Sequence, residues 1–153
     1  MNTKNLLLCL VILLVGSSAA RAGGDSDGDG MADAYEDANG LNKNSNADRD
    51  SDLDGDGQSN YREFLAGTGA NDATSTFRIL IASLSDLNEI TLTWTSVAGK
   101  TYQASVSSDL GDTSPWLTLG GTVTAKGPTA SAPPGMFVPP GLPRYFLRVE
   151  VVP

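Results

Sequence analysis

The sequence is poor in the residues that most often carry catalytic and metal chemistry. Among its 153 residues there is no histidine, and Cys9 is the single cysteine. One cysteine cannot form an internal disulfide, and a chain without histidine has no Ser-His or Cys-His nucleophile pair and no ordinary zinc site. Basic residues are scarce as well, 10 against 18 acidic ones for a net charge of −8. This balance argues against nucleic acid as a partner, and we expect that the protein is not an enzyme.

The sequence also lacks an apolar run long enough to span a bilayer as a helix. Its main apolar run, residues 6–15, follows Lys4 and leads to the small-residue site Ala20-Arg21-Ala22. This arrangement is typical of a secretory signal peptide over residues 1–22, and an uncleaved anchor is the alternative. We expect the mature protein to begin at Gly23, to be secreted or held at the cell surface, and to have no transmembrane segment after signal cleavage.

Aspartate and glycine are abundant, and they form one pattern that is written twice. The first copy starts at Asp25 and the second at Asp52, and the offset between these two aspartates also relates Glu36 to Glu63 and Gly40 to Gly67. A constant offset over loop and following segment indicates an internal duplication. The alternative is a solvated, disordered acidic linker, since runs of like charge often are. Two full matches in constant register favour the duplication.

Each copy fits the twelve-residue calcium loop D-x-D-x-D-G-x-x-[DN]-x-x-E at every specified position. Short acidic side chains at positions 1, 3 and 5 can converge on one ion, a backbone carbonyl joins at position 7, position 9 often acts through water, and a bidentate carboxylate at position 12 closes the site. About two calcium ions are therefore the expected cofactor. The predicted ligands are Asp25, Asp27, Asp29, the Met31 carbonyl, Asp33 and Glu36 in the first loop, and Asp52, Asp54, Asp56, the Gln58 carbonyl, Asn60 and Glu63 in the second.

The charge of this region predicts that its folding depends on metal. Residues 25–63 hold twelve acidic and three basic residues, and carboxylates at this density repel one another. Two calcium ions would offset much of that repulsion. Two further acids, Asp48 and Asp50, continue the acidic alternation upstream of the second loop. They are either outer-shell groups or solvated side chains, and the sequence favours solvated.

The segments that follow the loops are expected to be short helices. Residues 32–39 and 60–66 each stop before a glycine suited to a left-handed cap. Position 8 of the loops holds Ala32 and Ser59, where the β-bridge of paired EF-hands normally uses a branched apolar residue. Residues 23–70 are therefore predicted to be a duplicated loop-helix module with EF-hand-like loops, rather than full EF-hands.

These strings resemble the bacterial thrombospondin type 3 repeat. The likeness rests on Asp25-Ser26-Asp27-Gly28-Asp29-Gly30, on Asn39-Gly40-Leu41, and on residues 52–57 with Glu63-Phe64-Leu65-Ala66-Gly67-Thr68. It implies an extracellular calcium-binding module that is ordered around its ions and has little core. Dockerin modules, which also duplicate a loop-helix calcium unit and serve for docking, are the alternative family.

Beyond a polar linker at residues 71–76 the hydrophobic period changes to two, which predicts β-strands. We expect a mostly β protein whose residues 77–153 form an antiparallel β-sandwich. In the first strand, Phe77, Ile79 and Ile81 alternate with Arg78, Leu80 and Ala82. The proline-rich stretch 126–143 departs from this pattern, because proline cannot sit in a central strand. The other predicted strands are 90–95, 102–106, 116–119, a short one near Val123, and 145–151.

The order of aromatic residues in this part resembles a fibronectin type III domain. Leu92-Thr93-Trp94 precedes Tyr102-Gln103-Ala104, and Tyr145 begins a late strand. Trp94 lies on the alternating apolar face and is predicted to be core, whereas Trp116 follows a proline at a loop edge and is a weak candidate for an exposed contact. The acids of this part stand singly, so no pair of catalytic carboxylates can be picked out.

Together these patterns predict a secreted, non-enzymatic calcium-binding protein that acts as an extracellular or cell-surface interaction or spacer element, with a role in adhesion. The expected partners, besides calcium, are an extracellular protein or a polysaccharide. The alternative functions are a carbohydrate-binding accessory protein that uses the β-sandwich, and a dockerin-like docking module.

Overall fold

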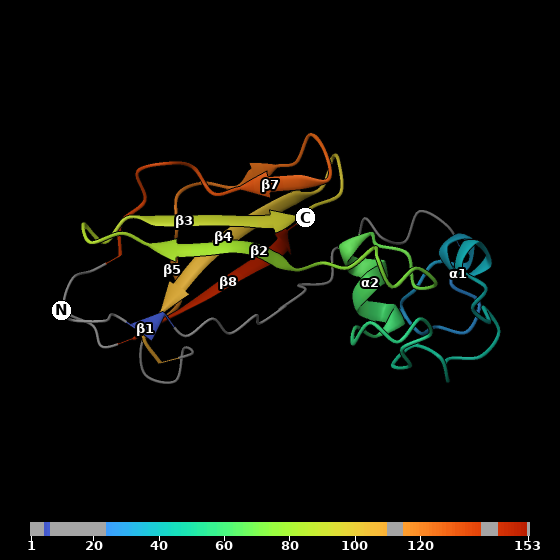
Figure 1. The fold of residues 1–153 in the computed structure, drawn as a ribbon. Helices are drawn as coiled ribbons and strands as arrows, with labels where there is room; N and C mark the ends of the chain where they lie inside the picture. The colour runs from blue at the N-terminus through green and yellow to red at the C-terminus, as the bar shows by residue number, and fades with distance from the viewer. Residues whose placement is uncertain (1–4, 7–23, 110–114, 139–143, 153) are drawn as a thin grey trace. The chain divides into compact units, whose positions relative to one another are not determined.

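The structure is a computed structural model that describes residues 5–6, 24–109, 115–138 and 144–152. Its described residues fall into two compact units, one of residues 24–77 and one of residues 5–6 and 78–152. The described chain is mostly β, with antiparallel sheets and two short helices (Figure 1). We call residues 24–77 the helical unit and the other unit the β unit.

The helical unit contains α1 (Asp33–Asn39) and α2 (Asn60–Ala66). Each helix follows one aspartate-rich loop and ends where the sequence predicts, before Gly40 and Gly67, whose φ angles are 75° and 79°. A left-handed cap of this kind favours glycine, because residues with a Cβ are strained at a positive φ. The two helices therefore repeat the duplication seen in the sequence, with the same offset.

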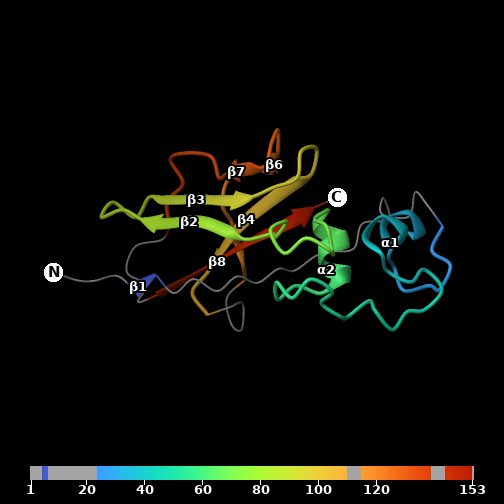
Figure 2. The ribbon, with the colours of Figure 1, turned by 45° about the vertical axis from the view of Figure 1, so that its right-hand side comes forward.

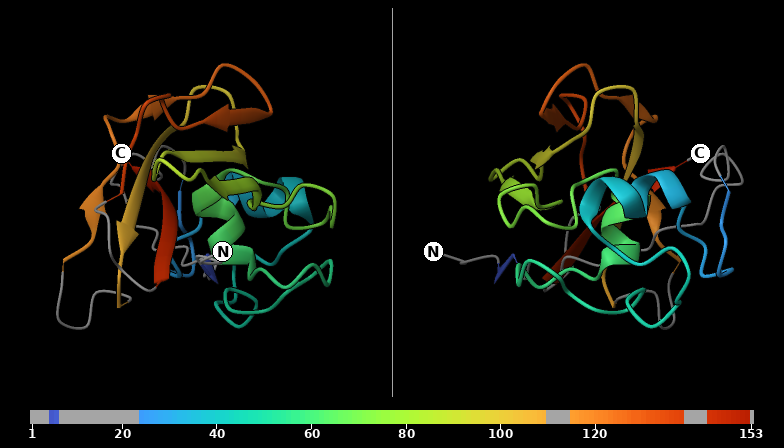
Figure 3. Two further views of the ribbon diagram at one scale, coloured as in Figure 1. Left: turned by 60° about the vertical axis from the view of Figure 1, so that its left-hand side comes forward. Right: turned by 90° about the vertical axis from the view of Figure 1, so that its right-hand side faces the viewer.

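A few aromatic side chains join the two halves of the helical unit. Tyr35 of α1 contacts Phe64 of α2 edge to face, with ring centroids 5.1 Å apart, and Tyr61 stacks on Phe64 at 6.4 Å. Figure 3 shows the two helices next to one another. Met31 is buried as well. This core is small, so packing alone supplies little of the stability that the unit needs.

The β unit is built from two sheets (Figures 1 and 2). One has the order β2-β3-β7 and is antiparallel; in the other, β4 pairs antiparallel with β5, β6 and β8, and β1 pairs parallel with β8. The strands are β1 (Asn5–Leu6), β2 (Ile79–Leu84), β3 (Ile90–Thr95), β4 (Thr101–Ser107), β5 (Leu117–Thr118), β6 (Val123–Thr124), β7 (Thr129–Ser131) and β8 (Arg144–Val152).

The core of the β unit lies between these sheets. Trp94 of β3 and Tyr102 of β4 are fully buried, with ring centroids 5.9 Å apart, and the Tyr102 hydroxyl accepts a hydrogen bond from the Val97 amide at 2.8 Å. Leu92 and Leu147 are buried around them. The prediction that Trp94 belongs to the core is confirmed, and the antiparallel sheets are consistent with the predicted β-sandwich.

The first strand departs from the predicted alternation. Ile79 lies opposite Trp94, but a register shift after it places Ile81 opposite Thr93 and Ala82 opposite Leu92. Ile81 is therefore 52% exposed, and the alternation that Phe77, Ile79 and Ile81 show in the sequence is not kept as an alternation of faces in the strand. A bulge inserts one residue into a strand, and because side chains alternate with period two, every later residue changes face.

Two of the described strands, β1 and β7, were not predicted. β7 comes from the proline-rich stretch 126–143 and pairs with β3 at the edge of its sheet. The sequence argument excluded a central strand there, and a short edge strand is compatible with the prolines that follow it.

Part of the predicted signal peptide is described as well. β1 pairs with the start of β8, Asn5 opposite Arg144 and Leu6 opposite Tyr145. The rest of residues 1–22, with the predicted cleavage site, lies outside the described residues. Within the described part of the chain, no helix combines the length and the apolar character that crossing a membrane requires.

Candidate metal centre

Each aspartate-rich loop is closed by the same backbone hydrogen bond. The amide of Asp33 donates to the carbonyl of Gly24 at 2.7 Å, and its counterpart Asn60 donates to Ser51 at 2.8 Å. Between these ends the chain turns at position 6 with a φ of 96° in both loops. That conformation is strained for a residue with a Cβ, which explains glycine at this position.

The first aspartate of each loop organises the turn. One carboxylate oxygen of Asp25 accepts from the amides of Gly28 and Asp29, at 2.8 and 3.1 Å, and the other accepts from Gly30 at 3.1 Å. Asp52 repeats this arrangement in the second loop with Gly55 and Gly57. A carboxylate that accepts hydrogen bonds from several backbone amides of a short loop fixes the conformation of that loop, and with it the positions of the other aspartates.

The aspartates at positions 3 and 5 keep oxygen atoms without partners. In the first loop, Asp27 and Asp29 each use Oδ1 to accept a backbone amide, while the Oδ2 atoms are buried and have no hydrogen-bond partner among the described residues. In the second loop Asp54 shows the same pattern. Asp56 differs, because its Oδ2 accepts from the Thr76 hydroxyl at 2.8 Å.

These side chains gather into groups that could hold a cation. Within the described residues, three groups of carboxylates have ligand oxygens that all lie within 4.8 Å of one another. Two of them consist of the aspartates at positions 1, 3 and 5 of a loop. The groups are Asp25, Asp27 and Asp29; Asp52, Asp54 and Asp56; and Asp29, Glu36 and Asp48.

The glutamates at position 12 are the most unusual groups of the unit. Glu36 and Glu63 are 0% exposed, and both oxygens of Glu36 and Oε2 of Glu63 lack a hydrogen-bond partner in the described chain. Burial, with the nearby aspartates, raises the pKa of each glutamate to about 7. Native proteins rarely leave a buried carboxylate unpaired, so each glutamate needs a cation or a proton.

The side chains at position 9 are hydrogen-bonded within their own loops. Both carboxylate oxygens of Asp33 are engaged by Ser26, which donates from its amide and its hydroxyl at 2.8 Å. These bonds lower the pKa of Asp33. Asn60 likewise accepts from the Leu53 amide through Oδ1 at 3.1 Å. Both side chains therefore close the loop in the structure.

The backbone at position 7 is placed by the aspartate two positions before it. The amide of Met31 donates to Asp29 and that of Gln58 to Asp56, each at 2.7 Å. Both Met31 and Gln58 are buried. The side-chain oxygen of Gln58 is also without a partner among the residues described.

The two acids between the loops, for which the sequence favoured a solvated state, differ from one another. Asp50 has a side chain that is 82% exposed and forms an ion pair with Arg49 at 2.8 Å. Asp48 instead joins Asp29 and Glu36, and its Oδ1 is buried without a partner in the described chain. Asp48 is thus the candidate residue that sequence reasoning missed. Its place in the acidic alternation was the only signal, and that signal did not separate it from Asp50.

The β unit contains Trp116, the weak candidate for an exposed aromatic contact. The carboxylate of Glu150 lies 3.1 Å from Nε of Arg148, and burial raises the pKa of Glu150. The Arg148 guanidinium lies 4.3 Å from the ring centroid of Trp116, which is half-buried. One face of this indole is therefore covered within the chain, which reduces its use as an exposed aromatic contact.

No known protein family, curated protein or solved structure matches this chain.

Proposed function

We propose that the helical unit binds two calcium ions, one in each aspartate-rich loop. The observation that supports this most strongly is the full burial of Glu36 and Glu63. Both oxygens of Glu36 and Oε2 of Glu63 lack a hydrogen-bond partner in the described chain, as do Oδ2 atoms of aspartates in the same loops. A buried carboxylate without a partner destabilises the fold. One divalent cation in each loop would relieve this cost for the glutamate of that loop.

The donor set favours calcium over other divalent ions. Every candidate ligand is an oxygen, and without histidine the chain cannot offer the nitrogen ligands that zinc and copper prefer. Calcium accepts six to eight oxygens at flexible geometry, whereas magnesium demands a smaller octahedral shell and retains its water. A loop with several aspartates and a glutamate that can bind through both oxygens supplies the larger number of oxygen ligands, which suits calcium.

We further propose that calcium shapes this unit for an extracellular, non-enzymatic role as an interaction or spacer element. The small aromatic core supports a structural role for the ions, because binding at a hundredfold excess over the dissociation constant adds about 2.7 kcal/mol per site. The proposal places the protein outside the cytoplasm, where extracellular calcium modules bind at ~10⁻⁴ to 10⁻³ M.

The test of calcium binding is calorimetric titration of the chain after it has been freed of metal. We expect a stoichiometry near two for the unaltered chain and near one for Glu36→Gln and for Glu63→Gln, because an amide is a poor bidentate ligand. Glu89→Gln, the same chemical change in the β unit, is the matched control and should leave the stoichiometry at two. Unchanged stoichiometry in both loop variants, or equal binding of magnesium, would refute the assignment.

The interaction role needs a separate test, because calcium binding alone does not establish it. Capture from an envelope extract in the presence and absence of calcium should recover a partner only with calcium. Glycan-array binding that does not respond to calcium would instead favour the carbohydrate-binding alternative.

A further inference from the structure

Asp48 lies outside both twelve-residue loops, yet its carboxylate belongs to the first one in space. Ligand oxygens of Asp48, Asp29 and Glu36 lie within 4.8 Å of one another. Oδ2 of Asp48 accepts from the Asn42 amide at 2.8 Å, which orients the carboxylate, and Oδ1 is buried without a partner in the described chain. The carboxylate of Asp48 therefore belongs to the same group as Glu36, both of whose oxygens lack a partner in the described chain.

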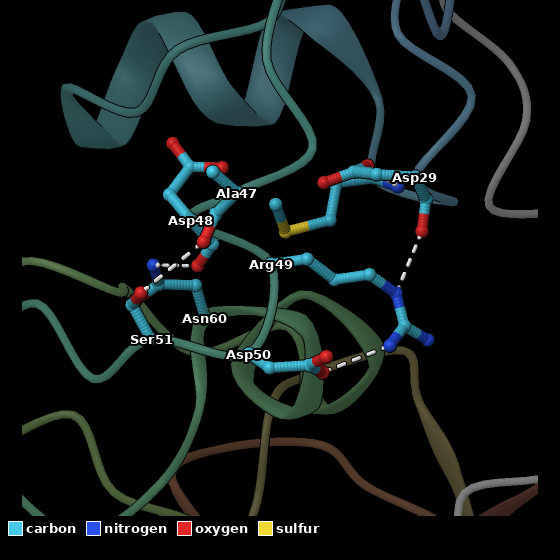
Figure 4. Close-up of polar contacts among 8 residues, drawn as sticks. Asp29, Ala47, Asp48, Arg49, Asp50, Ser51 and Asn60 are labelled. Carbon is cyan, nitrogen blue, oxygen red and sulfur yellow. Dashed lines mark hydrogen bonds and ion pairs between the residues drawn. The ribbon is translucent and has the colours of Figure 1, made fainter.

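The backbone of the same residue contacts the second loop. The side-chain amide of Asn60 donates to the Asp48 carbonyl at 2.7 Å, as Figure 4 shows, and Oδ1 of Asn60 accepts from the amide of Leu53 inside the second loop. Asn60 is only 1% exposed, so water does not compete for these bonds. One buried amide thus connects the second loop directly to the residue that faces the first.

The neighbouring residue, Arg49, also contacts both halves of the helical unit. Nε of Arg49 donates to the carbonyl of Asp29 at 2.8 Å (Figure 4). The Arg49 guanidinium lies 3.7 Å from the ring centroid of Tyr61. The amide of Tyr61 donates to the Arg49 carbonyl at 3.0 Å. The segment 48–49 is therefore bonded to position 5 of the first loop and to the start of α2.

The second loop has no equivalent carboxylate among the described residues. The offset between the two copies relates Asp48 to Ser75, and the next residue, Thr76, donates its hydroxyl to Oδ2 of Asp56. A neutral hydroxyl thus stands near the second loop where the first has an additional anion. The duplication is asymmetric at this point, and the first loop gains one negative charge from outside its own twelve positions.

We propose that Asp48 is a further ligand of the ion in the first loop and that residues 48 and 60 couple occupancy of the first site to the second. The inference rests on the proposed calcium binding. An ion held by Asp48 fixes the segment 48–49, and this segment positions Asn60 and Tyr61 at the second loop. Because coupling between two binding sites is reciprocal, each ion then favours binding of the other.

The ligand role is tested by calcium titration of the chain carrying Glu63→Gln, in which the first loop is the site that remains. Asp48→Asn should raise the dissociation constant of this site at least about tenfold, which is the lower range for losing a supporting group at a metal centre. The control is Asp50→Asn, two positions away, which removes the same charge from an exposed side chain and should change the constant less than about twofold. Equal effects of the two variants would overturn the ligand role.

The coupling is tested through Asn60→Asp. This variant keeps the oxygen that accepts from Leu53, as Asp33 does with Ser26 in the first loop, and replaces the amide that donates to Asp48. With Asn60 present, Glu36→Gln should weaken the second site about fivefold or more. With Asn60→Asp, the same loss of the first site should change the second less than about twofold.

The outcomes of these experiments distinguish this inference from the proposal of two calcium sites on which it rests. The inference would be overturned if Asp48→Asn and Asp50→Asn changed the dissociation constant of the first site equally. It would also be overturned if Glu36→Gln shifted the dissociation constant of the second site equally with Asn60 and with Asn60→Asp. Either result would leave the two calcium sites intact. A chain that binds no calcium at all would overturn both.

Discussion

Removing calcium should make the stability of the helical unit depend strongly on pH, because the buried Glu36 and Glu63 then lack a cation. Their pKa values are about 7 in the folded unit against 4.5 for a free glutamate. The folded unit therefore holds protons that the unfolded chain releases. With pKa values raised on folding, the stabilisation is present below about pH 4.5 and is lost as the pH rises through about 7.

The size of this effect follows from the two shifts. Each corresponds to about 3 kcal/mol of unfolding free energy between pH 4.5 and pH 7, or about 6 kcal/mol together. A unit of about 50 residues has a total stability of about 3 to 8 kcal/mol, so the loss is comparable with the whole. We expect the calcium-free unit to be unfolded at pH 8 and to regain structure at pH 5.

Hydrogen exchange read by peptide, with rates corrected for intrinsic exchange, measures this directly. Peptides from residues 24–77 of the calcium-free chain should be more protected at pH 5 than at pH 8, while buried β3 peptides serve as the internal control. Glu36→Gln should remove about half of the pH dependence, since glutamine does not titrate. Equal protection at both pH values, or greater protection at pH 8, would refute the reasoning.

Three further predictions concern the core, the turns and the amino terminus. Trp94→Ala should lower the unfolding free energy in denaturant titration by about 3–5 kcal/mol, whereas Ile81→Ala should cost far less, since half of that side chain is already exposed. Gly57→Ala should cost about 1–2 kcal/mol through its φ of 96°, and Gly30→Ala more, because its Cβ would lie 3.2 Å from the Tyr61 ring; equal melting temperatures would contradict this. Intact mass of the exported protein should place its first residue at Gly23, and a mass that includes residues 1–22 would contradict the signal peptide.

Local features of the fold could be predicted from the sequence with good accuracy. The two helices end at Gly40 and Gly67 as predicted, because a left-handed cap is decided by the residue that stands there. The strands around Trp94 and Tyr102 follow from alternation alone. The convergence of the aspartates at positions 1, 3 and 5 is local too, since each is held by amides that are close to it in sequence.

The features that were missed depend on chain segments that are distant in sequence. The side chain of Ile81 is exposed because a bulge changes how β2 pairs with β3, and no residue within β2 indicates that register shift. Asp48 and Asp50 have the same side chain and similar neighbours in sequence. Only the closure of the loop between α1 and the second aspartate-rich loop brings one beside Glu36 and leaves the other in solvent.

The sequence by itself determined where oxygen ligands for a hard cation stand and where the chain must turn, because both depend on side-chain chemistry and on backbone conformation over a short stretch. The tertiary structure decided which of those oxygens are buried, which are already hydrogen-bonded, as in Asp33 and Asn60, and which remain without a partner in the described chain. The physical reason is that desolvation and hydrogen bonding depend on every group within a few ångströms, and folding brings those groups from separate parts of the chain.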